Sequence, residues 1–511
     1  MTRSSANQRL NPIIPRKAEL GSILALIGLY LISDVVGEDQ SAMNVFGPSM
    51  LFVILGAGAW NLVKGDSLMI WTPLFSFRVA TGIYFGIGSL VPFFVDETSK
   101  TYLQEFYRFS DSEVAKLNLI VASMVFVVLA TCRTTYMVFP PTDRMVARVN
   151  DWGEQHEAKR IRNYGLFYVI VGSLINYLVI VPVAIGWVTI VLPGALTSLA
   201  AMSLCGIYLL TVWSLASARR AFPLVCCFVA LEMSVGLLMF NKTAALLPLM
   251  TFSMGLLVNK ISATRVALVC CGIGLALSMM QPLVSFARDE LIRRQGDYFG
   301  GSLTERYEIL ASYYFDPATL HSAGSVSQSG WTRVTYVNAG TFAIALYDRG
   351  YAGDSFKNMF AVLIPRVLWP DKPIDQTPRE FAAMSYGEFA ENSVTPTIFA
   401  EAYWNFGWLG IPMIGISLGL ALALLSINVI RLLNRKAWLY MPVLLTSMQF
   451  GLSIDGLFVS SVIGGAAILV GMQLSTAIVE ALMRSYGIDN PPRVPPAQQH
   501  SLSMAPVRMV R

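Results

Sequence analysis

Residues 411–430 read IPMIGISLGLALALLSINVI, and none of these side chains carries a charge. An α-helix rises about 1.5 Å per residue, so a helix of this length is about 30 Å long, which is the thickness of the hydrocarbon core of a bilayer. The stretch therefore predicts a transmembrane helix, and the fold depends on how often such a stretch recurs along the chain.

Comparable apolar runs recur throughout the 511 residues. With 55% hydrophobic and 14% charged residues, the chain has more apolar side chains than a soluble core of this size needs. We therefore predict an all-α, polytopic membrane protein with about twelve transmembrane helices. The predicted spans are 20–36, 45–63, 68–95, 114–138, 164–186, 189–216, 221–240, 243–258, 266–286, 402–430, 438–456 and 458–481.

Basic residues mark one side of the predicted membrane protein. Short cytoplasmic loops carry an excess of Lys and Arg, and here the basic clusters at the N-terminus, in 139–163, at 219–220 and at 431–436 fall on one side of the span count. Both termini are therefore predicted to be cytoplasmic, with 96–113 and 287–401 on the opposite side. The net charge of +5 comes largely from this bias, so nucleic acid is not predicted as a partner.

The stretch 287–401 is too long for a plain connector, and loops of this length are usually functional. Ser302 and Glu305 have the spacing of a capping box, which predicts the start of a helix. Two further helices are predicted from about Trp331 to Tyr347 and from Asp354 to Trp369. The apolar residues at helical spacing in the first helix are Leu303, Tyr307, Leu310 and Tyr314.

The third of these helices has an apolar stripe, which suits either a helix lying on the membrane surface or one packing on the protein's own spans. The stripe consists of Phe356, Met359, Phe360, Leu363 and Ile364. The predicted organisation is 1–286 with about nine spans, 287–401 as a large non-cytoplasmic loop with short amphipathic helices, 402–484 with about three spans, and 485–511 as a disordered cytoplasmic tail.

Two motifs in the second half carry a family resemblance. The sequence IPRVLWPDKP at 364–373, followed by EAYWNFGWLG at 401–410, resembles the bacterial oligosaccharide repeat-unit polymerases of the Wzy type, which assemble O-antigen or exopolysaccharide. NKTAALLP at 241–248 and an Arg just after the span that opens the large loop, Arg288, are also similar. In the rest of the first half the resemblance is limited to hydropathy and to Arg78.

This resemblance implies a membrane glycosyltransferase of the bacterial inner membrane, with its transmembrane helices in a GT-C-like arrangement. Its substrates would be undecaprenyl-pyrophosphate-linked oligosaccharides, joined on the periplasmic face without a metal, a nucleotide sugar or another cofactor. Its partners would be the lipid bilayer, a flippase and a chain-length regulator. The sequence does not distinguish O-antigen from capsule or exopolysaccharide.

Such a transfer needs cations to hold a departing diphosphate, and the planar guanidinium of arginine pairs well with phosphate oxygens. Each candidate also has a structural interpretation: Arg366 could cap a helix, Lys372 could form a turn salt bridge with Asp371, and Arg78 could pair with Glu232 or Asp455. The candidate substrate-binding residues are Arg78, Lys242, Arg288, Arg333, Arg366 and Lys372.

The transfer also needs a base for the acceptor hydroxyl, which a carboxylate or a histidine can supply. The candidates are Glu401, Asp371 and His321, with Glu388 as a further carboxylate on the same side. Glu401 could instead be an interfacial carboxylate, and His321 a solvated surface residue. Aromatic residues could stack on sugars or anchor the protein in lipid. They are Trp331, Trp369, Tyr403, Trp404 and Trp408.

Three other functions stay open. A metal-dependent polyprenyl-phosphate-sugar glycosyltransferase of the GT-C type would keep an acidic pair in the first outer loop, where Glu38 and Asp39 stand. An O-antigen ligase would differ only in the acceptor. A flippase for the lipid-linked oligosaccharide would not need the large loop. All six cysteines lie in apolar segments, so neither a disulfide framework nor a metal site is predicted.

Overall fold

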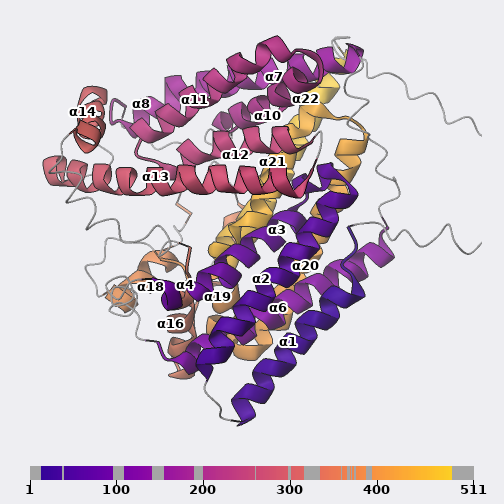
Figure 1. Ribbon diagram of the computed structural model, residues 1–511, viewed down its shortest axis with the longest axis vertical. Helices are drawn as coiled ribbons and strands as arrows, with labels where there is room; N and C mark the ends of the chain where they lie inside the picture. Colours follow the sequence, from indigo (N-terminus) through magenta and orange to yellow (C-terminus); the bar gives the residue numbers. More distant parts are fainter. Residues whose placement is uncertain are drawn as a thin grey trace, which may run out of the picture.

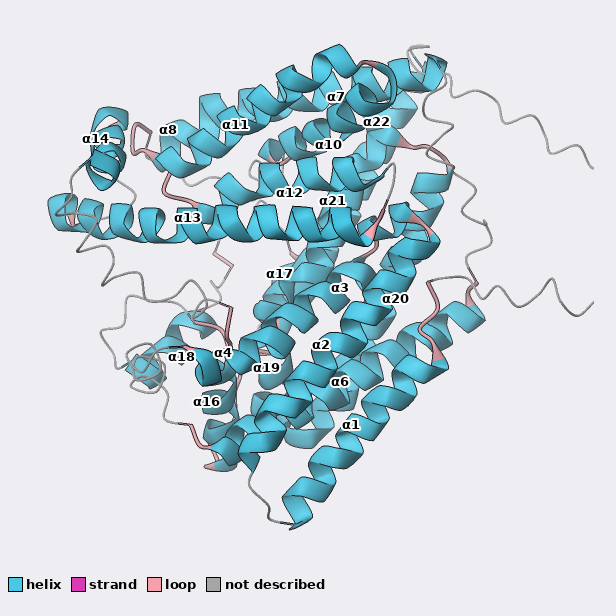
Figure 2. Ribbon diagram, in the orientation of Figure 1, coloured by secondary structure: helices cyan, strands magenta, loops and turns pink. Residues whose placement is uncertain are grey.

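The computed structural model is built from helices, and no strand occurs in the residues that it describes (Figure 2). Those residues are 13–36, 40–95, 109–140, 155–188, 199–258, 261–296, 301–315, 334–357, 359–364, 369, 371–372, 376–386 and 394–485. The prediction of an all-α fold is therefore confirmed for this part of the chain.

Within the described ranges, nine helices are long and apolar enough to cross a membrane. Helices α10 and α12 are shorter apolar helices, and α21 has only 12 residues. Each of the twelve predicted spans overlaps one of these helices, so the polytopic character is confirmed, whereas the number of crossings stays a prediction. The nine are Lys17–Val36, Gln40–Gly65, Pro73–Phe94, Asp111–Val138, His156–Ala184, Arg219–Leu238, Ala263–Gln295, Thr397–Asn434 and Phe458–Ser485.

The helices form two groups (Figure 1). The first group consists of α1 (Lys17–Val36), α2 (Gln40–Gly65), η1 (Ser67–Trp71), α3 (Pro73–Thr81), η2 (Gly82–Ile87), α4 (Gly88–Phe94), α6 (Asp111–Val138), α19 (Thr397–Phe406), η7 (Gly407–Leu409), α20 (Gly410–Asn434), η8 (Trp438–Tyr440), α21 (Met441–Leu452), η9 (Ser453–Asp455), η10 (Phe458–Gly464) and α22 (Gly465–Ser485). The second group consists of α7 (Gln155–Ile175), η4 (Asn176–Ile180), α8 (Val181–Ala184), α10 (Met202–Ser217), η5 (Arg219–Ala221), α11 (Phe222–Leu238), α12 (Lys242–Val258), α13 (Ala263–Gln295) and α14 (Leu303–Phe315).

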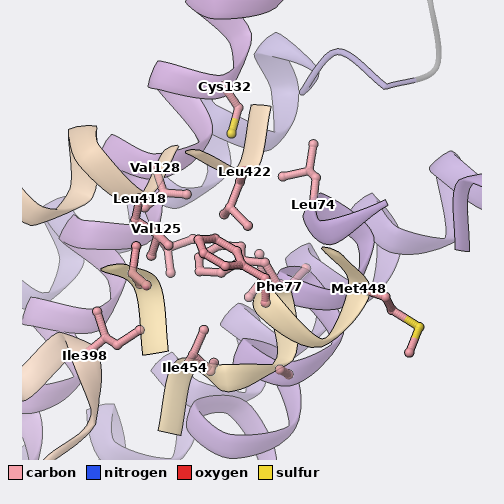
Figure 3. Packing of buried hydrophobic residues seen from close by; sticks show 14 of the residues in the cluster. Leu74, Phe77, Val125, Val128, Cys132, Ile398, Leu418, Leu422, Met448 and Ile454 are labelled. Atoms are coloured by element: carbon pink, nitrogen blue, oxygen red, sulfur yellow. The ribbon is translucent and has the colours of Figure 1, made fainter. Parts of the chain in front are cut away.

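The core of the first group lies between α3, α6 and α20, with α21 beside α3 (Figure 3). Leu74 and Phe77 of α3 meet Val125 of α6 and Leu422 of α20 there, and all four side chains are fully buried. The outer helices instead keep large apolar side chains on their surfaces, such as Leu275 of α13. This pattern suits helices that face lipid on one side and other helices on the other.

Glycines let neighbouring helices approach closely. A Cβ atom on Gly172 of α7 would lie 2.2 Å from the backbone N of Ser203 in the first turn of α10, and one on Gly419 of α20 would lie 2.7 Å from the carbonyl O of Val128 of α6. Lipid tails are as apolar as the helices, so close van der Waals packing of this kind is a main source of helix association in a membrane.

The ends of the helices lie on two opposite sides of the protein. At one side, which we call the basic end, Arg133 at the end of α6 donates to the carbonyl O of Pro15 before α1 (2.6 Å), and Tyr440 before α21 donates to Glu480 near the end of α22 (2.7 Å). The start of α1 and the end of α22 thus lie at the same end, as the span count predicts. The basic cluster at 431–436 lies between the end of α20 and Tyr440, and therefore at this end as well.

The opposite side, the loop end, carries α14 and three more short helices, α16 (Val337–Asp348), α17 (Met359–Leu363) and α18 (Thr377–Tyr386). Lys116 at the start of α6 pairs with Asp348 at the end of α16 (2.6 Å), which fixes α16 at this end. All described helices between 301 and 386 therefore belong to the loop predicted from the sequence.

The helices of this loop differ in detail from the prediction. The capping box is confirmed, because Ser302 Oγ accepts the backbone N–H of Glu305 at the start of α14. The predicted helix from Asp354 to Trp369 is wrong in length, since among its described residues only Met359–Leu363 is α-helical. Helix α18 was not predicted, because Pro378 and the polar residues around it resemble a loop.

A Gly172→Ala substitution should lower the stability of the protein, because the added methyl group meets the backbone of Ser203. We expect a loss of about 1–3 kcal/mol, the usual cost of overpacking. Thermal unfolding in detergent would measure it.

Gly272→Ala on α13 is the matched control, because a Cβ atom there meets nothing within 4 Å. Its midpoint of thermal unfolding should stay the same or rise slightly, since Ala favours a helix. Equal midpoints for the two variants would contradict the packing described for α7 and α10.

Candidate functional site

Two of the predicted cations meet at the turn between α11 and α12, at the loop end. Phe240 in this turn has a positive φ of 50°, and its carbonyl O accepts a hydrogen bond from Arg288 Nε of α13 at 2.8 Å. Lys242 at the start of α12 donates to Ser285 Oγ, one turn before Arg288, at 3.4 Å. Packing of α12 against α13 therefore brings both cations to one turn.

A third cation, Arg306 of α14, joins this turn, and sequence reasoning missed it. Its guanidinium donates to the carbonyl oxygens of Leu238 at the end of α11 (3.3 Å) and of Ala184 at the end of α8 (3.4 Å). It also lies over the ring of Phe240, with its Cζ atom 5.0 Å from the ring centroid. We call Lys242, Arg288 and Arg306 the cation cluster.

Arg306 is only 1% exposed, and burial lowers the pKa of its guanidinium. Arginine nevertheless stays protonated in proteins, so a full positive charge lies beneath the turn. The aligned carbonyls at the ends of α8 and α11 carry partial negative charge and stabilise this cation. Arg306 thus holds α14 against the helices of the second group.

The apolar pattern of α14 does not coincide with its buried residues. Tyr307 is 66% exposed and Tyr314 is 57% exposed, whereas Arg306 and Ile309 are buried. Apolar spacing alone could not separate a face that packs on protein from one that meets the membrane surface, where aromatic side chains are also favoured. The sequence does indicate that Arg306 lies on an apolar face, because Ile309 and Leu310 follow it at helical spacing.

Glu401, the first predicted base, is fully buried in α19. Its Oε1 accepts a hydrogen bond from Ser355 Oγ at 2.5 Å, and its Oε2 accepts one from the backbone N–H of Phe458 at 2.5 Å. Asn405 Nδ2 also donates to Ser355 Oγ. Both carboxylate oxygens of Glu401 are therefore engaged in joining α19 to the loop before α17 and to η10.

Asp371 and Lys372 lie beyond α17. Asp371 is exposed. Lys372 Nζ donates to the carbonyl oxygens of Val362 and Ile364, each at 3.1 Å, and so satisfies carbonyls at the end of α17. Its contacts therefore agree with a structural role at the C-terminus of this helix.

Several predicted site residues lie outside the described residues. They are Arg333, Arg366 and His321, together with Glu388, Trp331 and the acidic pair Glu38 and Asp39.

Arg78 lies apart from the other candidates, in the half of the span Pro73–Phe94 that is nearer the basic end. It forms a bidentate ion pair with Glu19 of α1, with Nε 2.8 Å from Oε1 and Nη2 2.9 Å from Oε2. The predicted partners Glu232 and Asp455 are therefore wrong. Gly58 of α2 makes room for the pair, because a Cβ atom there would lie 2.4 Å from Oε1 of Glu19. The pair joins α1 to α3 and is not at the loop end.

The predicted sugar-stacking aromatics divide between interior and surface. Trp404 is buried and donates through Nε1 to the carbonyl O of Tyr351 (3.0 Å), and Tyr403 donates to Asp348 Oδ1 (2.9 Å). Trp408 is 48% exposed and Trp369 is 38% exposed. Among the four of these aromatics that the structure describes, only Trp369 and Trp408 have ring surface available to a sugar or to lipid.

Comparison with known proteins finds no matching family model, no matching curated protein and no matching solved structure. In the part of the chain that the structure describes, no group of three or more His, Cys, Asp or Glu side chains is arranged to hold a metal ion. The functional argument therefore rests on the chemistry of the residues themselves.

Removing one partner of the Arg78–Glu19 pair should destabilise the protein more than removing both. An Arg78→Met variant leaves a buried carboxylate without its cation, and we expect a loss of about 3–5 kcal/mol. In the double variant Arg78→Met with Glu19→Gln, most of this stability should return. Thermal unfolding in detergent measures both.

The same double variant tests the predicted role of Arg78 in substrate binding. Since the pair lies away from the loop end, a folded double variant should keep its activity. A folded but inactive double variant would indicate that Arg78 takes part in substrate binding.

Proposed function

We propose that this protein is a polymerase that joins polyprenyl-pyrophosphate-linked oligosaccharide units into a surface polysaccharide. The reaction would take place at the loop end, facing away from the cytosol, in a bacterial inner membrane. The excess of basic residues in the short loops at the other end supports this orientation.

The observation that carries the proposal is the meeting of Lys242 and Arg288 at one turn. Both residues belong to the sequence features that resemble the polymerase family, although they are 46 positions apart (288 − 242). Arg288 donates to the carbonyl O of Phe240 in the α11–α12 turn, and Lys242, which follows this turn, donates to Ser285 of α13. Charged donors of this kind bind phosphate oxygens more strongly than neutral donors do. A lipid-borne diphosphate at the membrane surface is the ligand that fits them best.

Each transfer involves two lipid diphosphates, because both the donor and the acceptor are lipid-linked. One diphosphate leaves at the reacting carbon, and the other stays on the acceptor lipid, one repeat unit away. The cation cluster can thus serve the acceptor lipid without being the reaction centre itself.

The surface of α14 also supports binding of a lipid-linked substrate. Tyr307, Tyr314 and Phe315 are exposed beside the cation cluster, and Phe315 is 86% exposed. Aromatic side chains of this kind are typical of the membrane–water interface, where a lipid headgroup lies. The cluster and the aromatic face together match a ligand with a phosphate head and a lipid tail.

The test is the formation of a product ladder by purified protein given lipid-linked repeat units without added metal. Lys242→Gln and Arg288→Gln each keep a hydrogen-bond donor while removing the charge. If the cluster binds diphosphate, each variant should raise KM by about tenfold to a hundredfold and change kcat little.

Arg293→Gln is the matched control, because Arg293 is on the same helix but 76% exposed and paired with Glu290. Its KM should equal that of the unaltered protein. A normal KM in both cluster variants would contradict the assignment of the cluster. Single additions to a lipid A core acceptor would favour a ligase, and dependence on a divalent metal would favour the GT-C alternative.

A further inference from the structure

Asp455 lies at the loop end where the helical path of the chain is interrupted. Helix α21 ends at Leu452, η9 covers Ser453–Asp455, and the chain is extended at Leu457 before η10 begins at Phe458. Sequence reasoning considered Asp455 only as a partner for Arg78. The structure places it at the opposite end of the first group, half-buried.

Two segments distant in the sequence contact Asp455, and a third packs on one of them. Its Oδ2 accepts a hydrogen bond from Tyr336 OH just before α16 at 3.1 Å, and its backbone carbonyl O accepts one from Thr395 Oγ1 just before α19 at 2.6 Å. The ring of Tyr336 packs edge-on against Tyr84 of η2, with centroids 5.2 Å apart. The side chain is therefore held in place from more than one direction.

The two oxygens of the carboxylate differ. Oδ2 is held by Tyr336, while no other described residue donates a hydrogen bond to Oδ1, and Asp455 forms no ion pair in the part of the chain that the structure covers. One oxygen is thus oriented by the protein and the other is accessible, which is the arrangement that a general base needs.

The backbone beside Asp455 is strained. Thr397, two residues after Thr395, has a φ of +73° although it is β-branched and fully buried, and its hydroxyl has no hydrogen-bond partner among the described residues. Such a conformation costs about 1–3 kcal/mol and persists where the surrounding structure enforces it, often at active sites. This is a second, independent sign of a functional centre.

Glu401 orients this centre. By accepting the backbone N–H of Phe458, its carboxylate fixes the first residue of η10, three positions after Asp455. A buried negative charge at a helix start is favourable because of the partial positive charge there. The carboxylate that the sequence proposed as the base is thus better explained as a positioning residue.

We infer that Asp455 is the general base that takes the proton from the acceptor hydroxyl, an inference that rests on the proposed polymerase function. The acceptor oxygen forms a bond to the anomeric carbon of the donor glycan, and the bond from that carbon to the diphosphate oxygen breaks. The lipid diphosphate leaves with the electron pair of the broken bond. The acceptor proton moves to Oδ1 of Asp455 and then to water.

The test uses the full-length protein in detergent or nanodiscs with lipid-linked repeat units. Asp455→Asn keeps the size of the side chain and can still accept the hydrogen bond from Tyr336, so it should fold. It should lower kcat by about a hundredfold to ten-thousandfold, the usual contribution of a general base, with little change in substrate binding. Asp354→Asn, an exposed carboxylate before α17, is the matched control and should be unchanged.

Two more variants separate a base from a structural residue. Tyr336→Phe should lower kcat less than Asp455→Asn does, because the base remains but is less well oriented. Glu401→Gln should lower the midpoint of thermal unfolding together with kcat, whereas Asp455→Asn should lower kcat alone.

Several outcomes would overturn the inference. If the unaltered protein forms a ladder and Asp455→Asn forms it at the same rate, Asp455 is not the base. If Asp371→Asn lowers kcat and Asp455→Asn does not, the general base is Asp371. Absence of any ladder from the folded, unaltered protein would instead contradict the proposed function itself.

Discussion

Hydrocarbon offers no hydrogen-bond partner, so each peptide group within a bilayer must be satisfied by its own chain. This constraint explains why the described spans are helices and why they associate through close contacts such as Gly172 against Ser203. It also explains why charged side chains inside the helix groups are paired. Arg78 has Glu19, and Glu232 of α11 accepts a hydrogen bond from Tyr177 at 2.8 Å.

The same constraint applies at the loop end, where the backbone departs from regular helix and its peptide groups need other partners. Phe240 and Thr397 have positive φ values, and the chain is interrupted between α21 and η10. Carbonyl and amide groups released by these irregularities are satisfied by side chains, as Arg288 does for Phe240 and Glu401 does for Phe458. Cations and carboxylates are thereby concentrated at the loop end, where we propose that the reaction takes place.

The fold could be predicted because its signals are local. A run such as 411–430 identifies a helix by its own length and composition, and the basic clusters assign the helix ends to two sides without knowledge of the packing. The capping box at Ser302 and Glu305 is equally local, and the structure confirms it.

The site could be predicted only in part, because side-chain partners depend on which helices pack together. Nothing in the sequence around Arg78 indicates that α1 lies beside α3, so Glu19 was missed. The burial of Arg306 depends on the carbonyls at the ends of α8 and α11. Glu401 has the right residue type and the right end of the protein for a base, but only the structure shows that Ser355 and Phe458 occupy both of its oxygens.

The central claim is that the loop end faces away from the cytosol. It can be tested with single cysteines in a chain whose six native cysteines are replaced, at Tyr351→Cys on the loop end and at Ser485→Cys on the basic end. In intact spheroplasts, a thiol reagent that cannot cross the membrane should label Tyr351→Cys at once and Ser485→Cys only after permeabilisation. The reverse pattern would place the cation cluster and Asp455 in the cytosol and contradict the account.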